Sequence, residues 1–137
     1  MRRNRAIGED QKQQLSSQFS SALTNVKVVF GDHPFRRIRR TDSEQVVWDT
    51  SLNRAVFDIQ MLAFVGLPLE EVEQRGEALL ERFRVLCLEN TEFADALSRA
   101  TADRSRFYTR LRIWGENLAE EGIAPAYLPH LPRLPSP

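Results

Sequence analysis

Apolar residues recur at helical spacing along most of the chain. Between residues 9 and 30 they follow one another at steps of four, four, three and four, which traces one stripe of a helix. The stripe consists of Leu15, Phe19, Leu23, Val26 and Phe30. We therefore predict a helix here, with a polar opposite face. Gly31 and Pro34 predict its end, because glycine accepts a left-handed conformation and proline cannot continue a helix.

A second predicted helix, over residues 53–65, is apolar on nearly every side. Either Ser51 or Asn53 can cap its first amides. A helix with so little polar surface is expected at the centre of a fold, so we expect Phe57, Leu62 and Phe64 to be largely buried. The segment before it, residues 35–49, has no sustained period and is predicted to be an irregular connector, either throughout or with a short extended piece.

Three further helices are predicted downstream. Pro68 suits the start of a helix over residues 69–88, and Asn90 or Thr91 can cap a short helix after it. The last helix follows a polar turn at residues 101–105, and Ser105 is its candidate cap. These patterns together predict an all-α fold of about five helices in a compact orthogonal bundle.

The chain divides into three parts by composition. We expect a flexible basic N-terminus over residues 1–8, a single helical domain over 9–122 and a proline-rich tail over 123–137. The tail carries five prolines, several of them at every third residue, which favours an extended polyproline helix outside the core. Removing such a tail is expected to leave stability nearly unchanged.

Composition excludes several classes of protein. The 19 basic and 19 acidic side chains cancel, so no global attraction to nucleic acid or to an anionic membrane is indicated. No segment approaches the roughly 18 apolar residues that span a bilayer, and no apolar signal core follows the basic start. The single cysteine, Cys87, cannot form an internal disulfide. We therefore expect a cytoplasmic protein without membrane contact.

The sequence offers no assembled catalytic or metal site. Its six glycines are scattered singly, which excludes a glycine-rich phosphate loop, and neither His33 nor His130 stands beside a plausible nucleophile. We predict no enzymatic activity, no cofactor and no metal. Asp58 is unusual because it lies inside the most apolar helix, where an unpaired carboxylate is unfavourable. Arg54, one turn earlier, is its local candidate partner, although Asp58 could instead orient a group in a neighbouring site.

Arginine dominates the basic residues, because only Lys12 and Lys27 are lysines. One arginine cluster precedes the second predicted helix and another lies around the last. The planar guanidinium suits phosphate and carboxylate groups, so the clusters are either solvated faces or binding surfaces. The candidates for interaction or phosphate binding are Arg36, Arg37, Arg39, Arg40, Arg104, Arg106 and Arg110.

Four segments in this order resemble a known family. They are residues 29–36, 52–58, 93–101 and 104–114. The chain is similar to the C-terminal helical region of the ParB/sulfiredoxin-like family of proteins of unknown function, which includes the N-terminal half of GmrSD-type restriction enzymes. The resemblance covers nearly all of residues 9–120. It implies structural roles for Asn53, Arg54, Phe57, Asp58, Thr101 and Ser105.

The same resemblance bears on function. The family's chemistry belongs to an upstream ParB-like domain with an Asp-Gly-Gln-Gln-Arg type motif, and no such motif occurs in this sequence. We therefore expect a non-enzymatic accessory or interaction module of a defence or restriction system, with a ParB-like or nuclease subunit, or another copy of itself, as partner. The alternative hypothesis is a DNA-binding module that uses the arginine clusters.

Overall fold

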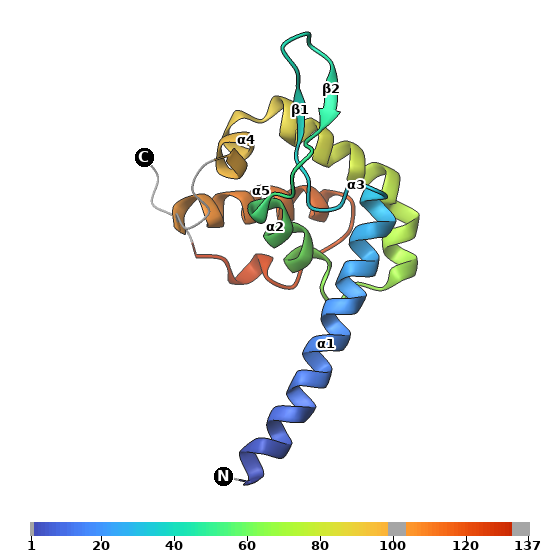
Figure 1. Cartoon of the computed structure of the whole chain (residues 1–137), viewed down its shortest axis with the longest axis vertical. Helices are drawn as coiled ribbons and strands as arrows, with labels where there is room; N and C mark the ends of the chain where they lie inside the picture. The colour runs from blue at the N-terminus through green and yellow to red at the C-terminus, as the bar shows by residue number, and fades with distance from the viewer. Residues whose placement is uncertain (1, 99–103, 133–137) are drawn as a thin grey trace.

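The computed structural model describes residues 2–98 and 104–132, with side chains described from residue 10 onward. The order of elements is α1 (Arg2–Phe30), β1 (Ile38–Arg40), β2 (Val46–Trp48), α2 (Arg54–Phe64), α3 (Leu69–Glu89), α4 (Thr91–Ser98) and α5 (Arg104–Glu120), followed by a short 3-10 turn, η1 (Leu128–His130). The helices form a bundle from which half of α1 and the β1–β2 hairpin project (Figure 1). The mostly helical class and the five helices are confirmed; the orthogonal packing stays a prediction.

The helix ends use the capping residues that the sequence offered. Asn53 caps α2 by accepting a hydrogen bond from the amide of Val56 at 3.0 Å, and Asn90 caps α4 through the amide of Phe93 at 2.9 Å. Asn53 also donates to the carbonyl of Leu97 at 3.2 Å, which joins the start of α2 to the end of α4. Ser105 does not precede α5 as predicted, because the helix already begins at Arg104.

An aromatic cluster forms the centre of the bundle. Phe30 of α1 meets the ring of Phe83 edge-on with centroids 5.1 Å apart, and Trp114 of α5 meets Phe83 at 5.7 Å. Phe64 of α2 and Phe93 of α4 complete the cluster, and all five side chains are buried. Each of the five helices therefore contributes one ring, and burial of rings of this size dominates core stability.

Only the C-terminal half of α1 packs on this core. Val26 and Phe30 are buried, whereas Leu15 and Phe19 of the same stripe are 63% and 50% exposed. Asn25 fixes the packed half by donating to the carbonyls of Phe64 and Leu67 at the end of α2. The predicted helix is present, but its stripe does not face the core along its whole length, because the rest of the bundle ends where α1 continues outward (Figure 1).

The second helix is central, but not all of its apolar residues are covered. Phe64 and Ile59 are fully buried, Phe57 is half-buried, and Leu62 is 42% exposed. The prediction that Leu62 is buried is therefore wrong. An all-round apolar pattern suggested complete coverage, whereas the bundle leaves one side of α2 open.

The predicted irregular connector contains a β-hairpin, so the fold is not purely α. Strands β1 and β2 pair antiparallel, with Ile38 opposite Trp48 and Arg40 opposite Val46. Glu44 in the connecting turn has a φ of 68°, which places its backbone in the left-handed region. Ile38 is buried and Trp48 packs against the core. Three-residue strands are too short for the alternation of polar and apolar residues to be recognised in a sequence.

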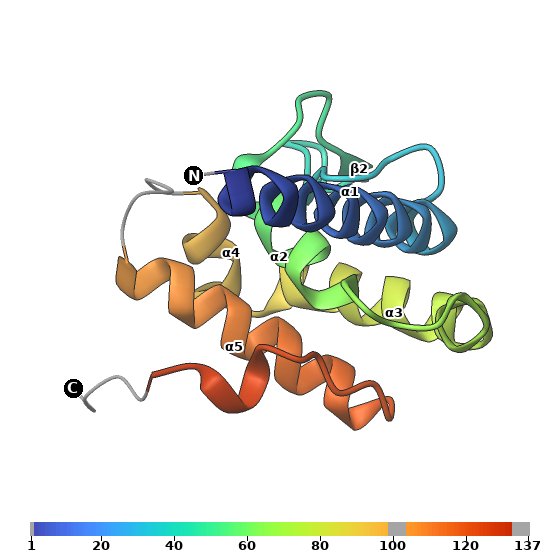
Figure 2. The ribbon, with the colours of Figure 1, turned by 90° about the horizontal axis from the view of Figure 1, so that it is seen from below.

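The proline-rich segment is part of the bundle as far as it is described. Ile123 is fully buried, and the Tyr127 hydroxyl donates to the carbonyl of Leu111 at 2.7 Å. Leu131 packs against the core as well, and the segment runs back along α5 (Figure 2). The expected tail outside the core is wrong for residues 123–132, because proline restricts the backbone but leaves the apolar neighbours able to pack.

Replacing Gly115 by alanine is expected to destabilise the protein by about 1 kcal/mol, because overpacking outweighs the better helix propensity of alanine. A Cβ there would lie 2.9 Å from both a Leu128 methyl carbon and the Tyr127 hydroxyl. Gly76→Ala is the matched control, since nothing lies within 4 Å of a Cβ at that helical position. It should stabilise by about 0.5–1 kcal/mol. Urea unfolding measures the stability of both variants. An equal gain in stability for Gly115→Ala and Gly76→Ala would contradict the close packing at Gly115.

Candidate functional site

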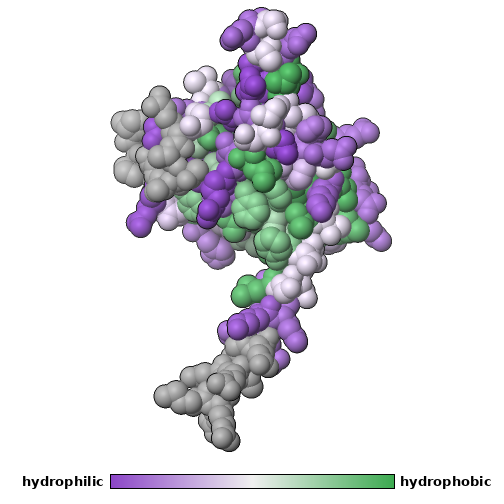
Figure 3. Space-filling model, in the orientation of Figure 1, coloured by the Kyte–Doolittle hydropathy of each residue, from purple (hydrophilic) through white to green (hydrophobic). Residues whose placement is uncertain are grey.

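An apolar groove lies where α1 leaves the body of the protein. Its floor is one side of α2, formed by Phe57, Met61, Leu62 and Val65. Leu15 and Phe19 of α1 form one wall, and Phe107 of α5 contributes to the lining. The groove has a volume of about 360 Å³. Figure 3 shows apolar surface on the body beside the departing helix.

The groove is anchored by a buried ion pair. Arg110 of α5 is fully buried, and its guanidinium lies 3.8 Å from a carboxylate oxygen of Asp58, which lines the groove. It also donates to the carbonyl of Ala96 at 3.2 Å and lies over the ring of Phe107. Arg54 forms the predicted pair with Asp58 at 3.6 Å, but its side chain is 76% exposed. The buried partner of Asp58 is therefore Arg110.

The groove continues beyond Phe57 towards the hairpin. A neighbouring depression is lined by Phe35, Leu52, Asn53, Arg54 and Phe57. Phe35 has a φ of 65°, a strained conformation for a non-glycine residue that costs about 1–3 kcal/mol. Two contacts hold it there. The Phe35 amide donates a hydrogen bond to the side-chain oxygen of the buried Gln60 at 2.9 Å, and the ring centroids of Phe35 and Phe57 are 4.8 Å apart. Leu52 is 67% exposed, so apolar surface extends along this edge.

The arginines of the first cluster are held mostly by the hairpin itself. Arg37 donates to one carboxylate oxygen of Asp49 at 3.0 Å, and Arg39 donates to the other. Arg36 donates to the carbonyl of Thr50 at 2.7 Å. Arg40 is exposed, and no ion pair of it is found within the described residues. Three of the four candidates therefore stabilise the base of the hairpin.

The second cluster does not form one basic face either. Arg106 pairs with Asp95 of α4 at 3.3 Å, and Arg110 is buried. Arg104 is exposed at the start of α5. The prediction that Arg110 could face a partner or a phosphate is wrong, because its side chain has no contact with solvent.

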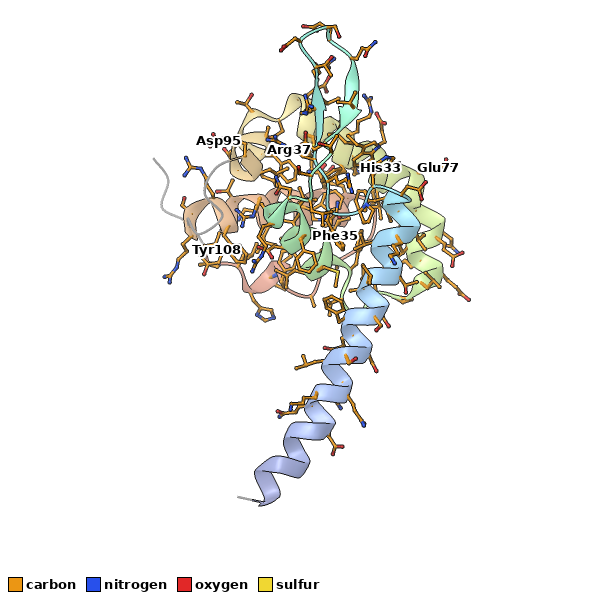
Figure 4. The ribbon with its side chains drawn as sticks, in the orientation of Figure 1. His33, Phe35, Arg37, Glu77, Asp95 and Tyr108 are labelled. Atoms are coloured by element: carbon orange, nitrogen blue, oxygen red, sulfur yellow. The ribbon has the colours of Figure 1, made fainter. Side chains whose placement is uncertain are left out.

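The two clusters both lie against α4, because Arg37, Arg39 and Arg40 share a depression with Ala94, and Arg106 pairs with the neighbouring Asp95. In Figure 4, Arg37 is at the foot of the hairpin, Asp95 is on α4 and Tyr108 is towards the start of α5. Within the described ranges the hairpin packs on α3, not on α5. A single basic face would favour DNA binding, but most of the arginines in both clusters are paired within the chain or buried.

Thr101 and Arg99 fall outside the described residues, so the proposed turn cannot be placed. Ser105 lies in the first turn of α5 and is exposed. Asn53 caps α2, and Phe57 lines the groove. Sequence reasoning did not assign the groove to Met61, Val65 and Phe107. Their apolar character was the only feature of the sequence that could have indicated a binding surface.

His33 and the possible metal ligands were the remaining candidates for chemistry. His33 stacks on Trp48 with centroids 4.9 Å apart, as a turn residue against the hairpin. No group of three or more His, Cys, Asp or Glu side chains that could hold a metal ion occurs in the described part of the chain. None of the described helices is long and apolar enough to cross a membrane.

Cys87 is expected to be unreactive in the folded protein. Burial raises the pKa of its thiol from about 9 to about 12, so at pH 8 its thiolate fraction should be about 1000-fold lower than in the unfolded chain. Because the folded protein keeps a proton that the unfolded chain releases, the free energy of unfolding should fall as pH rises from about 9 towards 12. Burial also raises the pKa of Tyr127, so this group likewise lowers the free energy of unfolding as the pH rises.

Alkylation by iodoacetamide at pH 8, with and without urea, measures this difference. Rapid modification of the native protein would contradict the burial of the thiol. The variant Cys87→Ala should weaken the alkaline loss of stability, which separates this group from Tyr127.

The fold and the groove define a small helical bundle with an open apolar surface beside a projecting helix. No family model matches the chain, and neither the curated proteins nor the solved structures provide a significant match.

Proposed function

We propose that the chain is a non-enzymatic helical accessory module that docks on a protein partner through the apolar groove. One observation carries the proposal: four large apolar side chains are each more than 40% exposed along two adjoining depressions, namely Leu15 and Phe19 of α1, Leu62 of α2, and Leu52 just before α2. Scattered exposed leucines are ordinary, but a contiguous patch beside a groove is typical of an interaction surface.

The groove has the chemistry of a helix-binding site. Its floor runs along one side of α2, where residues spaced by four form the ridge that a second helix packs against. Recognition of an amphipathic helix in an apolar groove is a recurring mode of protein binding. The resemblance to ParB-like defence proteins suggests a ParB-like or nuclease subunit, or another copy of the chain, as partner.

Direct DNA binding has less support. Arg36, Arg37, Arg39 and Arg106 have partners within the chain, and Arg110 is buried. DNA binding remains a hypothesis that fluorescence anisotropy with duplex and single-stranded DNA at low salt can decide, since phosphate contacts are strongest there.

A photocrosslinking amino acid placed at position 62 tests the proposed docking surface. In cells that express the full chain from its native context, this residue should form a covalent adduct with whatever fills the groove. The matched control is position 85, where Val85 is similarly exposed, at 38%, on α3 outside the groove. Adducts at position 62 and none at 85 support the proposal. No adduct at position 62, or equal adducts at both positions, would overturn it.

A further inference from the structure

The projecting half of α1 lacks support from its own chain. Every residue from 10 to 21 is exposed, and Ala22 is the first buried residue of the helix. We call residues 10–21 the arm. Figure 1 shows that the arm stands clear of the bundle. Leu15 and Phe19 lie one turn apart on the arm, so they present one apolar face.

The composition of the arm does not favour a solitary helix. Residues 11–21 contain one charged side chain, Lys12, and are otherwise mainly glutamine and serine. Ion pairs between residues four apart, which stabilise exposed helices, are therefore missing from this stretch. Helices of this length are marginal in water unless an amphipathic face is packed. The helical arm thus requires a surface that covers Leu15 and Phe19.

The surface that fits the arm is the groove beside it. The groove is apolar and follows α2, where Phe57 and Met61 are four residues apart, the same spacing as Leu15 and Phe19. Asp58, the one charged residue among the described residues that line the groove, is already paired with Arg110 and Arg54. Apolar side chains therefore carry the contact. A protruding helix and its complementary groove on the same molecule are the two halves of a self-complementary contact.

We propose that the groove is filled by the arm of a second copy of the chain. The inference rests on the function proposed above and names its partner. Two α1 helices run antiparallel across a twofold axis near Leu15 and Phe19, and each arm lies along α2 of the other copy. Such a contact uses the same patch on both molecules and closes on itself, so it yields a dimer and not a filament.

The area available is that of a stable dimer. The arm, residues 10–21, is about 18 Å long, at 1.5 Å per residue. Covering half of a cylinder of this length and about 10 Å in diameter buries on the order of 300 Å². Each copy contributes one such arm and one groove that receives the other arm. The total is on the order of 1,200 Å², which is the lower end of the range for stable interfaces.

The mass of the purified full-length chain in solution tests the dimer. Sedimentation and light scattering at micromolar concentrations should give twice the monomer mass of 15.8 kDa. The double variant Leu15→Glu/Phe19→Glu should raise the dissociation constant on the order of 100-fold or more, because carboxylates would be buried in an apolar contact. Its thermal unfolding as a monomer should show an intact bundle, since these side chains lie outside the core.

The control is Val28→Glu, on the opposite face of α1 and 41% exposed, which should remain dimeric. Leu62→Glu, on the groove side, should dissociate the dimer as the arm variant does. A monomeric wild-type chain at 100 µM, or a dimer that persists in both the arm and the groove variants, would overturn the inference.

These outcomes are separable from failure of the proposed function. A monomeric chain whose position 62 crosslinks to a different protein refutes self-association and leaves the docking function standing. A chain with no adduct at position 62 refutes both. An adduct with twice the mass of the chain, absent from the arm variant, supports both.

Discussion

Replacing Arg110 by alanine is expected to lower the free energy of unfolding by about 3–5 kcal/mol. The guanidinium is fully buried between Asp58 and the carbonyl of Ala96, at 3.8 and 3.2 Å. Among the described residues, its removal leaves the exposed Arg54 as the ion-pair partner of the carboxylate, and it opens space under the ring of Phe107. Loss of a buried charge and loss of packing therefore act in the same direction.

Urea unfolding followed by circular dichroism measures this effect. Arg104→Ala is the matched control, because Arg104 lies on the same helix and is exposed, and it should change stability by less than about 0.5 kcal/mol. The double variant Arg110→Met/Asp58→Leu should recover most of the loss, since well-packed apolar residues can replace a buried ion pair. Equal unfolding midpoints for Arg110→Ala and Arg104→Ala would show that the buried pair does not contribute.

Ending the chain after Gly122 is expected to destabilise the bundle by at least about 2–5 kcal/mol, the range for losing one large buried aliphatic side chain. Ile123 is fully buried, and Tyr127 contributes a 2.7 Å hydrogen bond to α5. The truncation removes both and exposes the face of α5 at Gly115 that Tyr127 and Leu128 cover.

A chain that ends after Pro132 is the reference, because it keeps every contact described for this segment. The two truncated proteins should differ in melting temperature by many degrees, since 1 kcal/mol shifts the midpoint of a domain of this size by several degrees. Identical melting curves would show that residues 123–132 do not stabilise the bundle, as expected for the extended tail that their composition predicts.

Much of the local structure follows from the sequence. Asn53 and Asn90 cap the helices they precede, because capping depends on a side chain and an amide three residues further on. The glycine that ends α1, Gly31, has a φ of 58°, a conformation that glycine adopts without strain. The pairing of Arg54 with Asp58 was predictable for the same reason, since both lie on one turn of one helix.

The candidate site was less predictable, because it depends on which apolar residues remain uncovered. Leu15 and Phe19 have the same periodicity as Val26 and Phe30, and only the end of the bundle decides that one pair is exposed and the other buried. Periodicity identifies a face that needs a partner, but it does not say whether the partner belongs to the same chain.

What the sequence by itself determined is the helical class, the helix ends and the local ion pair, all of which depend on residues within about one turn of each other. Tertiary structure alone decided that Arg110 is the buried partner of Asp58, 52 positions away, and that Ile123 belongs to the core. It also decided that α1 extends beyond the bundle. These features arise from contacts between distant segments, where packing and burial outweigh the local preferences that a sequence pattern expresses.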